Sequence, residues 1–301
     1  MFHPKSIMVV VDYRQAEHYA LPRAAEFARF FSSKLTLVCC VYPQIMDYKS
    51  ILGESLKQIK QHEIKQKKDL LEGLIEEFKL DDLEIKINVI WHKNFYQGLI
   101  NHIHEENYDL VVKTAHTHPK LSKLIMKPMD WHLLREVSEP ILFVKEGVKK
   151  GKKNIMGAIK IQTNGDHHDL NHKILDATQQ LAKMGTDDTH LVNVFPWPMV
   201  DVNKFRHLFD ESGYFDAAQK AHKKAMDEYL EKFDFDEDNV HVIEGLEPED
   251  IIPDIVTEAR VDLLVMGSVG REGLAAAMIG NTAEKILDEL GCDVLALKPD
   301  K

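Results

Sequence analysis

With 301 residues, 44% of them hydrophobic and 29% charged, the chain has the composition of a folded protein and the length of two domains. Acidic residues outnumber basic residues by 49 to 38, and the resulting net charge of -11 argues against a nucleic-acid partner. The first apolar run, residues 7–11, is too short for a signal-peptide core or a membrane span, so we expect a cytoplasmic protein without a membrane span.

In the first half of the chain, short apolar runs that favour strands alternate with longer amphipathic runs that favour helices. Strands are expected at residues 7–11, 35–41, 84–90, 110–112 and 141–144. Helices are expected at residues 21–31, 56–78, 96–104 and 131–137. Apolar strands separated by helices predict a parallel sheet with helices on both faces, which is a doubly wound α/β domain.

The second half of the chain repeats the first. Residues 89–145 align with residues 242–298 without a gap, at a shift of 153, and the apolar pattern matches throughout. A repeat of this length is a whole domain, so the sequence predicts a duplicated α/β domain rather than a solenoid. We expect the first domain at residues 1–147 and the second at residues 152–301, joined by the polar segment EGVKKGKK.

A glycine-rich loop follows the fourth expected strand of the second half, at the edge where sheets of this class bind ligands. Gly267 and Gly270 are spaced for a close approach of the backbone to a ligand. A helix with good N-cap residues then opens at Gly280, Asn281 and Thr282. Free amides at such a turn and helix N-terminus bind anions, so a phosphate-bearing ligand is expected, with glycines that serve only turns as the alternative.

The pattern Gly267-x2-Gly270-x9-Gly280-Asn281-Thr282 resembles the nucleotide-binding loop of the universal stress protein family, and the similarity covers the whole chain as a tandem. The resemblance implies a five-stranded parallel sheet in each domain, with ATP or another adenine nucleotide held by the loop. The nucleotide-binding residues that it implies in the second domain are Val194, Gly267, Ser268, Gly270, Arg271, Gly280, Asn281 and Thr282.

The first domain has a degenerate site, with threonine or lysine where the second domain has its three glycines. The members of this degenerate site are Asp12, Val41, Thr114 and Thr117, and Lys127 holds the third glycine position. In the second domain, Lys160 stands where the family has an aspartate after the first strand. Each domain therefore keeps one part of the family pattern, and nucleotide is expected in the second domain only.

Histidines at the strand ends of the first domain give a different hypothesis. Imidazoles at neighbouring strand ends are ligands that zinc accepts. The candidate zinc ligands are His92, His116, His118 and His132. Loop histidines without a function are the alternative.

Two functions follow from these features. The favoured hypothesis is a stress-response module that binds nucleotide without efficient catalysis, because no GxSxG, GxxxxGK, HExxH or CxxC motif is present and slow ATP hydrolysis is the most the loop suggests. The alternative is an enzyme or carrier for a phosphorylated or lipidic small molecule that uses the histidine cluster.

The chain also carries aromatic segments at residues 45–52 and 196–215, which would cover either a pocket for a hydrophobic ligand or simply the core. The family resemblance further implies that the last strands of the two domains join them as an intramolecular pseudo-dimer, and it leaves a further oligomer open.

Overall fold

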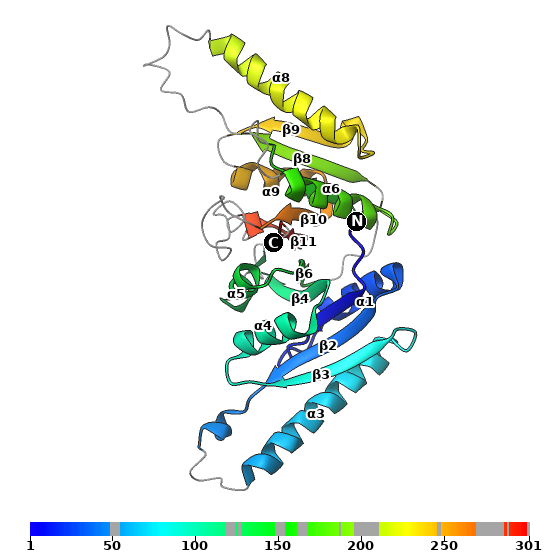
Figure 1. Ribbon diagram of the computed structural model, residues 1–301, viewed down its shortest axis with the longest axis vertical. Helices are drawn as coiled ribbons and strands as arrows, with labels where there is room; N and C mark the ends of the chain where they lie inside the picture. The colour runs from blue at the N-terminus through cyan, green and yellow to red at the C-terminus, as the bar shows by residue number, and fades with distance from the viewer. Residues whose placement is uncertain are drawn as a thin grey trace. The chain divides into compact units, whose positions relative to one another are not determined.

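The computed structural model describes residues 1–48, 55–117, 124–125, 128–147, 154–161, 168–186, 188–195, 211–245, 248–268, 286–287 and 289–299 (Figure 1). The chain forms two compact units. The N-terminal unit is built mainly from residues 3–117 and 125–148, and the C-terminal unit mainly from residues 149–301.

A five-stranded parallel sheet forms the centre of the N-terminal unit, in the order β3-β2-β1-β4-β6. Its strands are β1 (Ser6–Val10), β2 (Lys34–Val41), β3 (Ile85–Trp91), β4 (Leu110–Thr117) and β6 (Ile141–Lys145). A short strand, β5 (Leu124–Ile125), pairs with β4. Every residue of β2 after Lys34 is buried, as expected of a parallel strand covered on both faces.

Helices cover both faces of this sheet (Figure 1). They are α1 (Ala20–Phe31), α3 (Ser55–Glu77), α4 (Phe95–Glu106) and α5 (Pro128–Glu136), with a short 3-10 helix η1 (Gln44–Asp47) after β2. Helices α1 and α5 lie on opposite faces, because Thr114 of β4 reaches α1 whereas the preceding residue, Lys113, reaches α5. Helix α4 packs against α5 and therefore shares its face.

The C-terminal unit repeats this architecture, with parallel strands in the order β9-β8-β7-β10-β11. Its strands are β7 (Asn154–Ala158), β8 (Thr189–Phe195), β9 (Val240–Glu244), β10 (Val261–Gly267) and β11 (Asp293–Leu297). Its described helices are α6 (His168–Ala182), α8 (Glu211–Leu230), α9 (Pro248–Glu258) and the short 3-10 helix η2 (Glu237–Asn239). The predicted fold class, two tandem doubly wound α/β domains, is confirmed.

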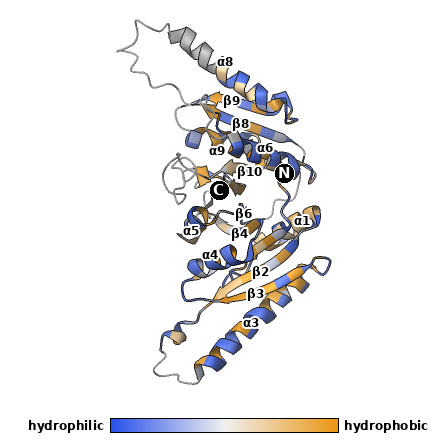
Figure 2. Cartoon of the chain, in the orientation of Figure 1, coloured by the Kyte–Doolittle hydropathy of each residue, from blue (hydrophilic) through white to orange (hydrophobic). Residues whose placement is uncertain are grey.

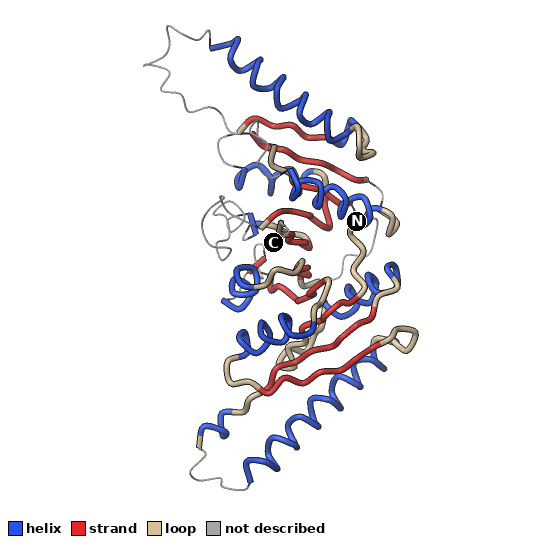
Figure 3. Tube along the Cα trace, in the orientation of Figure 1, coloured by secondary structure: helices blue, strands red, loops and turns tan. Residues whose placement is uncertain are grey.

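Hydropathy follows the layers of each unit. The strands are mainly apolar, whereas helices such as α3 have one polar and one apolar face (Figure 2). The alternation of helix and strand along the chain is seen in Figure 3. A membrane-spanning helix is absent from the described part of the chain, since none of its helices has the length and hydropathy that a bilayer requires.

Candidate functional site

The strand-one aspartate of the N-terminal unit is occupied by a cation from its own chain. Asp12 follows β1, and Arg14 donates to it from Nε at 2.8 Å and from Nη2 at 3.1 Å. This hydrogen bonding raises the pKa of Arg14, and the guanidinium also lies over the ring of Phe95, 5.2 Å from its centroid. A planar cation held by a carboxylate and an aromatic face therefore fills the place where the family pattern expects a free carboxylate.

Thr114 also has a partner within the N-terminal unit. The backbone N–H of Ala20 donates to Thr114 Oγ1 at 3.0 Å, although the two residues are 94 positions apart. The residue before helix α1, Tyr19, makes no side-chain cap. Strand β4 therefore supplies the cap that the local sequence lacks, at the end of the helix where the dipole is positive. The side chain of Thr117 is outside the described residues.

Gly267 ends β10 at the position that Thr114 holds in the N-terminal unit. A Cβ atom added to Gly267 would lie 2.7 Å from Cδ2 of Leu170 on α6, so the close approach of this helix gives the glycine a packing reason. The next amide, that of Ser268, donates to the carbonyl of Leu297 at 3.0 Å. The Ser268 amide is thus used within the sheet, and its side chain is buried. The predicted loop residues Gly270, Arg271, Gly280, Asn281 and Thr282 lie outside the described residues.

Two buried amide side chains hold the chain after β7, a feature that the sequence analysis missed. Lys160 is exposed, but its backbone N–H donates to Asn171 Oδ1 at 3.1 Å and its carbonyl accepts from Asn171 Nδ2 at 2.8 Å. The following amide, of Ile161, donates to Asn193 Oδ1 at 3.1 Å. Asn171 and Asn193 are 2% and 0% exposed, and no local sequence signal marks them as loop anchors.

The strand registers allow Val41 of β2 to be compared with Val194 of β8. Val41 pairs with Trp91, and its C-terminal counterpart in the ladder is Phe195, which pairs with Glu244. Val194 is one residue earlier and lies on the opposite face, near the α9 side chain Ile251. A slip of one residue exchanges the two faces of a strand, so Val41 and Val194 do not occupy equivalent places.

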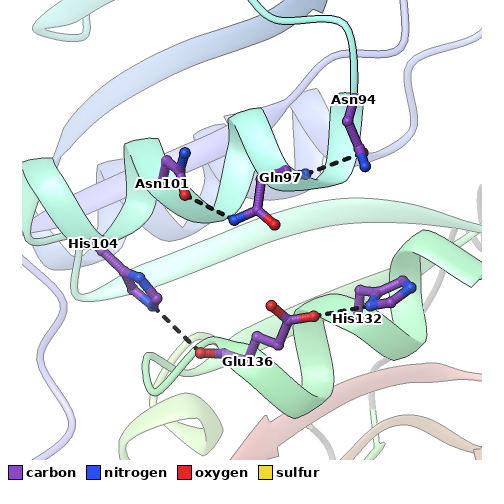
Figure 4. A network of polar contacts seen from close by, with 6 residues as sticks. All are labelled: Asn94, Gln97, Asn101, His104, His132 and Glu136. Carbon is purple, nitrogen blue, oxygen red and sulfur yellow. Dashed lines mark hydrogen bonds and ion pairs between the residues drawn. The ribbon is translucent and has the colours of Figure 1, made fainter.

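The predicted zinc ligands that can be located make contacts with nearby polar groups. His92 Nδ1 lies 3.2 Å from the backbone nitrogen of Asn94. His132 Nδ1 lies 2.9 Å from Glu136 Oε1, and its ring stacks on Tyr96 at 4.1 Å (Figure 4 shows the polar contacts).

The described residues contain no group of three His, Cys, Asp or Glu side chains placed to hold a metal ion. The side chain of His116 and the whole of His118 fall outside them. The zinc hypothesis therefore stays a prediction.

A buried ion pair lies beside the degenerate site. Lys113 Nζ is 2.6 Å from Asp130 Oδ1, and the two side chains are 6% and 0% exposed. Lys113 Nζ also donates to the carbonyl of Thr114 at 3.0 Å. The repeat places Met266 and Ala283 at these positions in the second half, so only the N-terminal unit buries this charge pair.

Of the two aromatic segments, the structure describes residues 45–48 and the backbone of residues 211–215, which belong to α8. Ile45 and Tyr48 are exposed there, whereas Met46 is buried. Segment 196–215 has no described side chain.

The family model of the "Universal stress protein family" matches residues 3–145 and 165–298. The chain belongs to the universal stress protein family. It is 30% identical over 304 residues to the universal stress protein E homolog of Haemophilus influenzae, covering 99% of this chain and 98% of that protein. It is 32% identical over 300 residues to universal stress protein E of Salmonella typhi, covering 99% of this chain and 95% of that protein.

Solved structures agree with this assignment. The crystal structure of a putative universal stress protein from Pseudomonas aeruginosa UCBPP-PA14 has a TM-score of 0.74 and 27% sequence identity, covering 99% of this chain and 94% of that one. The chain is therefore a tandem universal stress protein with a role in the stress response.

Proposed function

We propose that this protein is a stress-response module that binds ATP or a related phosphate-bearing ligand in its C-terminal unit, without efficient catalysis. The observation that carries the proposal is that Thr114 of β4 is replaced by glycine, Gly267, at the corresponding position of β10. In the N-terminal unit, the Thr114 hydroxyl accepts the first N–H of α1. A glycine offers no such hydroxyl, so an anion is the expected partner for amides at this end of the C-terminal unit.

The sequence beyond Gly267 supports the same ligand. Its glycine spacing and the Asn281-Thr282 pair resemble the family loop that holds the phosphates of ATP. Arg271 in this loop adds a cation suited to phosphate oxygens. The loop contains no Walker lysine motif, which fits binding better than rapid phosphoryl transfer.

Contacts within the N-terminal unit support the binding of a single nucleotide to each chain. Arg14 already neutralises Asp12, and Thr114 already caps α1. A nucleotide entering here would have to displace contacts that the chain makes with itself. We therefore expect about one nucleotide per chain, in the C-terminal unit.

The test is a matched pair of substitutions measured by titration calorimetry with ATP and Mg²⁺. Gly280→Asp places a carboxylate against the proposed phosphate position, and Lys127→Asp places the same carboxylate at the corresponding position of the N-terminal unit. We expect Gly280→Asp to weaken ATP binding at least about 100-fold and Lys127→Asp to leave it unchanged.

Equal affinity in the wild type and in Gly280→Asp would refute the C-terminal site. Loss of binding in Lys127→Asp alone would move the site to the N-terminal unit. Circular dichroism of both variants establishes that the fold is retained, and identification of small molecules released on denaturation of the wild type reveals the ligand that co-purifies.

A further inference from the structure

Two histidines meet inside the C-terminal unit, away from the proposed ligand site. His190 lies on β8 and His241 on the neighbouring strand β9. Nδ1 of His190 is 3.3 Å from Nε2 of His241, and the rings stack with centroids 5.5 Å apart and an interplanar angle of 22°. His190 is 7% exposed, and its other ring nitrogen, Nε2, is buried with no hydrogen-bond partner among the described residues.

This geometry is compatible with two neutral imidazoles, and it makes protonation of both rings unfavourable. One N–H is shared between the two facing nitrogens, with one ring as donor and the other as acceptor. When both rings are protonated, two N–H donors face each other and two positive charges are buried together. A proton placed on the buried Nε2 of His190 also lacks an acceptor among the described residues.

The charged surroundings oppose this penalty only in part. Burial lowers the pKa of both histidines, and His241 lowers that of His190 further. The carboxylate of Asp188, before β8, raises the pKa of His190, and that of Glu258, at the end of α9, raises the pKa of His241. For both histidines the net direction is downward.

Within the part of the chain that the structure describes, no other ionisable group contributes to these two pKa shifts. Strand β7 contributes no ionisable side chain to the contact. His222 on α8 stacks on Phe195, and both Phe195 and Glu244 are an odd number of residues from the histidine of their own strand, so they point to the opposite face. The electrostatic balance at the pair is therefore set by the two imidazoles and the carboxylates of Asp188 and Glu258.

The N-terminal unit provides a natural comparison. Met8 pairs with Thr36 where Met156 pairs with His190, and Val38 pairs with Asn88 where Val192 pairs with His241. Thr36 and Asn88 carry no titratable group. Asn88 Nδ2 lies 3.3 Å from Nε2 of a single histidine, His102, which also contacts the hydroxyl of Tyr108 at 3.0 Å. The N-terminal unit thus pairs its imidazole with neutral groups, and the C-terminal unit pairs two imidazoles with each other.

We propose that His190 and His241 form an acid-sensitive latch between β8 and β9. Strand β9 is the last in the strand order of its unit, and β8 is its ladder partner. Helix α8 packs on β9, so protonation of the pair loosens both elements together. The device gives a stress-response protein a structural response to a fall in pH, independent of whether nucleotide binds.

The direction of the effect follows from proton linkage. Because the pKa of each imidazole is lower in the closed state than in the open state, the open state binds more protons, and the closed state loses stability as the pH falls through about 6.5. The loss is complete below the lowered pKa of the pair. Above about pH 7.5 the latch contributes its full stability.

Hydrogen exchange measured by mass spectrometry on the full chain tests the latch. Exchange of β9 and α8 peptides is compared between wild type and the variants His190→Thr and His241→Asn, which carry the residues of the N-terminal unit. Comparison at equal pH cancels the intrinsic pH dependence of exchange. Between roughly pH 7.5 and pH 5.5, we expect exchange in β9 of the wild type to rise about tenfold relative to His241→Asn. Peptides of β2 and β3 should exchange alike in the wild type and in both variants. The control variant His62→Asn, at an exposed position of α3, should show the same rise in β9 exchange as the wild type.

A parallel pH dependence in wild type and His241→Asn would overturn the latch. An independent measurement, NMR titration of the histidine side chains in the wild type, needs no substitution. We expect His190 and His241 to titrate as a coupled pair, with pKa values below the ordinary histidine value of about 6.5. Independent titration of both rings at ordinary values would equally exclude the proposal.

Discussion

The buried ion pair of the N-terminal unit gives the sharpest prediction on stability. Asp130→Ala leaves the ammonium of Lys113 buried without its carboxylate, and we expect the free energy of unfolding to fall by about 3–5 kcal/mol. Lys113 Nζ and Asp130 Oδ1 are 2.6 Å apart, and both side chains are at most 6% exposed. At an effective dielectric of about 20, their attraction is about 6 kcal/mol, which is offset by desolvation of several kcal/mol for each ion.

The C-terminal unit indicates which uncharged residues can replace Lys113 and Asp130. Lys113→Met/Asp130→Ala introduces the residues that the repeat places at 266 and 283, and it removes both buried charges at once. Because the net contribution of such a pair is small, we expect this double variant to lose less than about 2 kcal/mol. The double variant should therefore be more stable than Asp130→Ala alone, by at least about 1 kcal/mol.

The assay is urea denaturation followed by hydrogen exchange of β4 and α5 peptides, which reports on the N-terminal unit. The exposed pair of Lys34 and Glu84, whose side chains are 68% and 69% exposed, is the control, and Glu84→Ala should cost less than about 1 kcal/mol. A loss below about 1 kcal/mol in Asp130→Ala, or a double variant no more stable than Asp130→Ala, would show that the reasoning is wrong.

Two further predictions concern buried polar groups. Thr114→Val keeps the shape of the side chain but removes the acceptor for the N–H of Ala20, so stability should fall by about 1 kcal/mol and exchange at the start of α1 should accelerate; unchanged exchange there would contradict the cap. Burial raises the pKa of Cys39 to about 12 and of Cys40 to about 11, so both remain thiols at pH 8. They should react with a disulfide reagent only after unfolding, and rapid labelling of the native protein would contradict their burial.

Periodicity in the sequence was sufficient to predict most elements of the N-terminal unit. The strands expected at 7–11 and 35–41 correspond to β1 and β2 within one residue at each end. Strand β4 is longer than expected, because its last residues, KTAHT, are polar or small and end the apolar run that was used to predict it. The short strand β5 was not predicted, because its two apolar residues, Leu124 and Ile125, are too few to form a pattern.

The candidate site was less accessible to sequence analysis. The repeat indicated that the residue type differs between corresponding positions of the two fourth strands, Thr114 and Gly267. It did not reveal that Thr114 caps α1, because the two partners are 94 positions apart. The ion pair of Arg14 with Asp12, two residues away, is a local contact that the sequence analysis did not consider. Val41 and Val194, the strand-two residues assigned to the two sites, are also not equivalent, because the ladder position of Val41 in the first sheet is that of Phe195 in the second.

The sequence by itself therefore determined the fold class and its duplication, since these depend on apolar periodicity and on similarity between the two halves. Only the tertiary structure decided which polar groups meet. Lys113 and Asp130, and His190 and His241, come from separate elements and show no motif. Their contacts depend on strand register and helix placement, and in a strand a shift of one residue moves a side chain to the other face of the sheet.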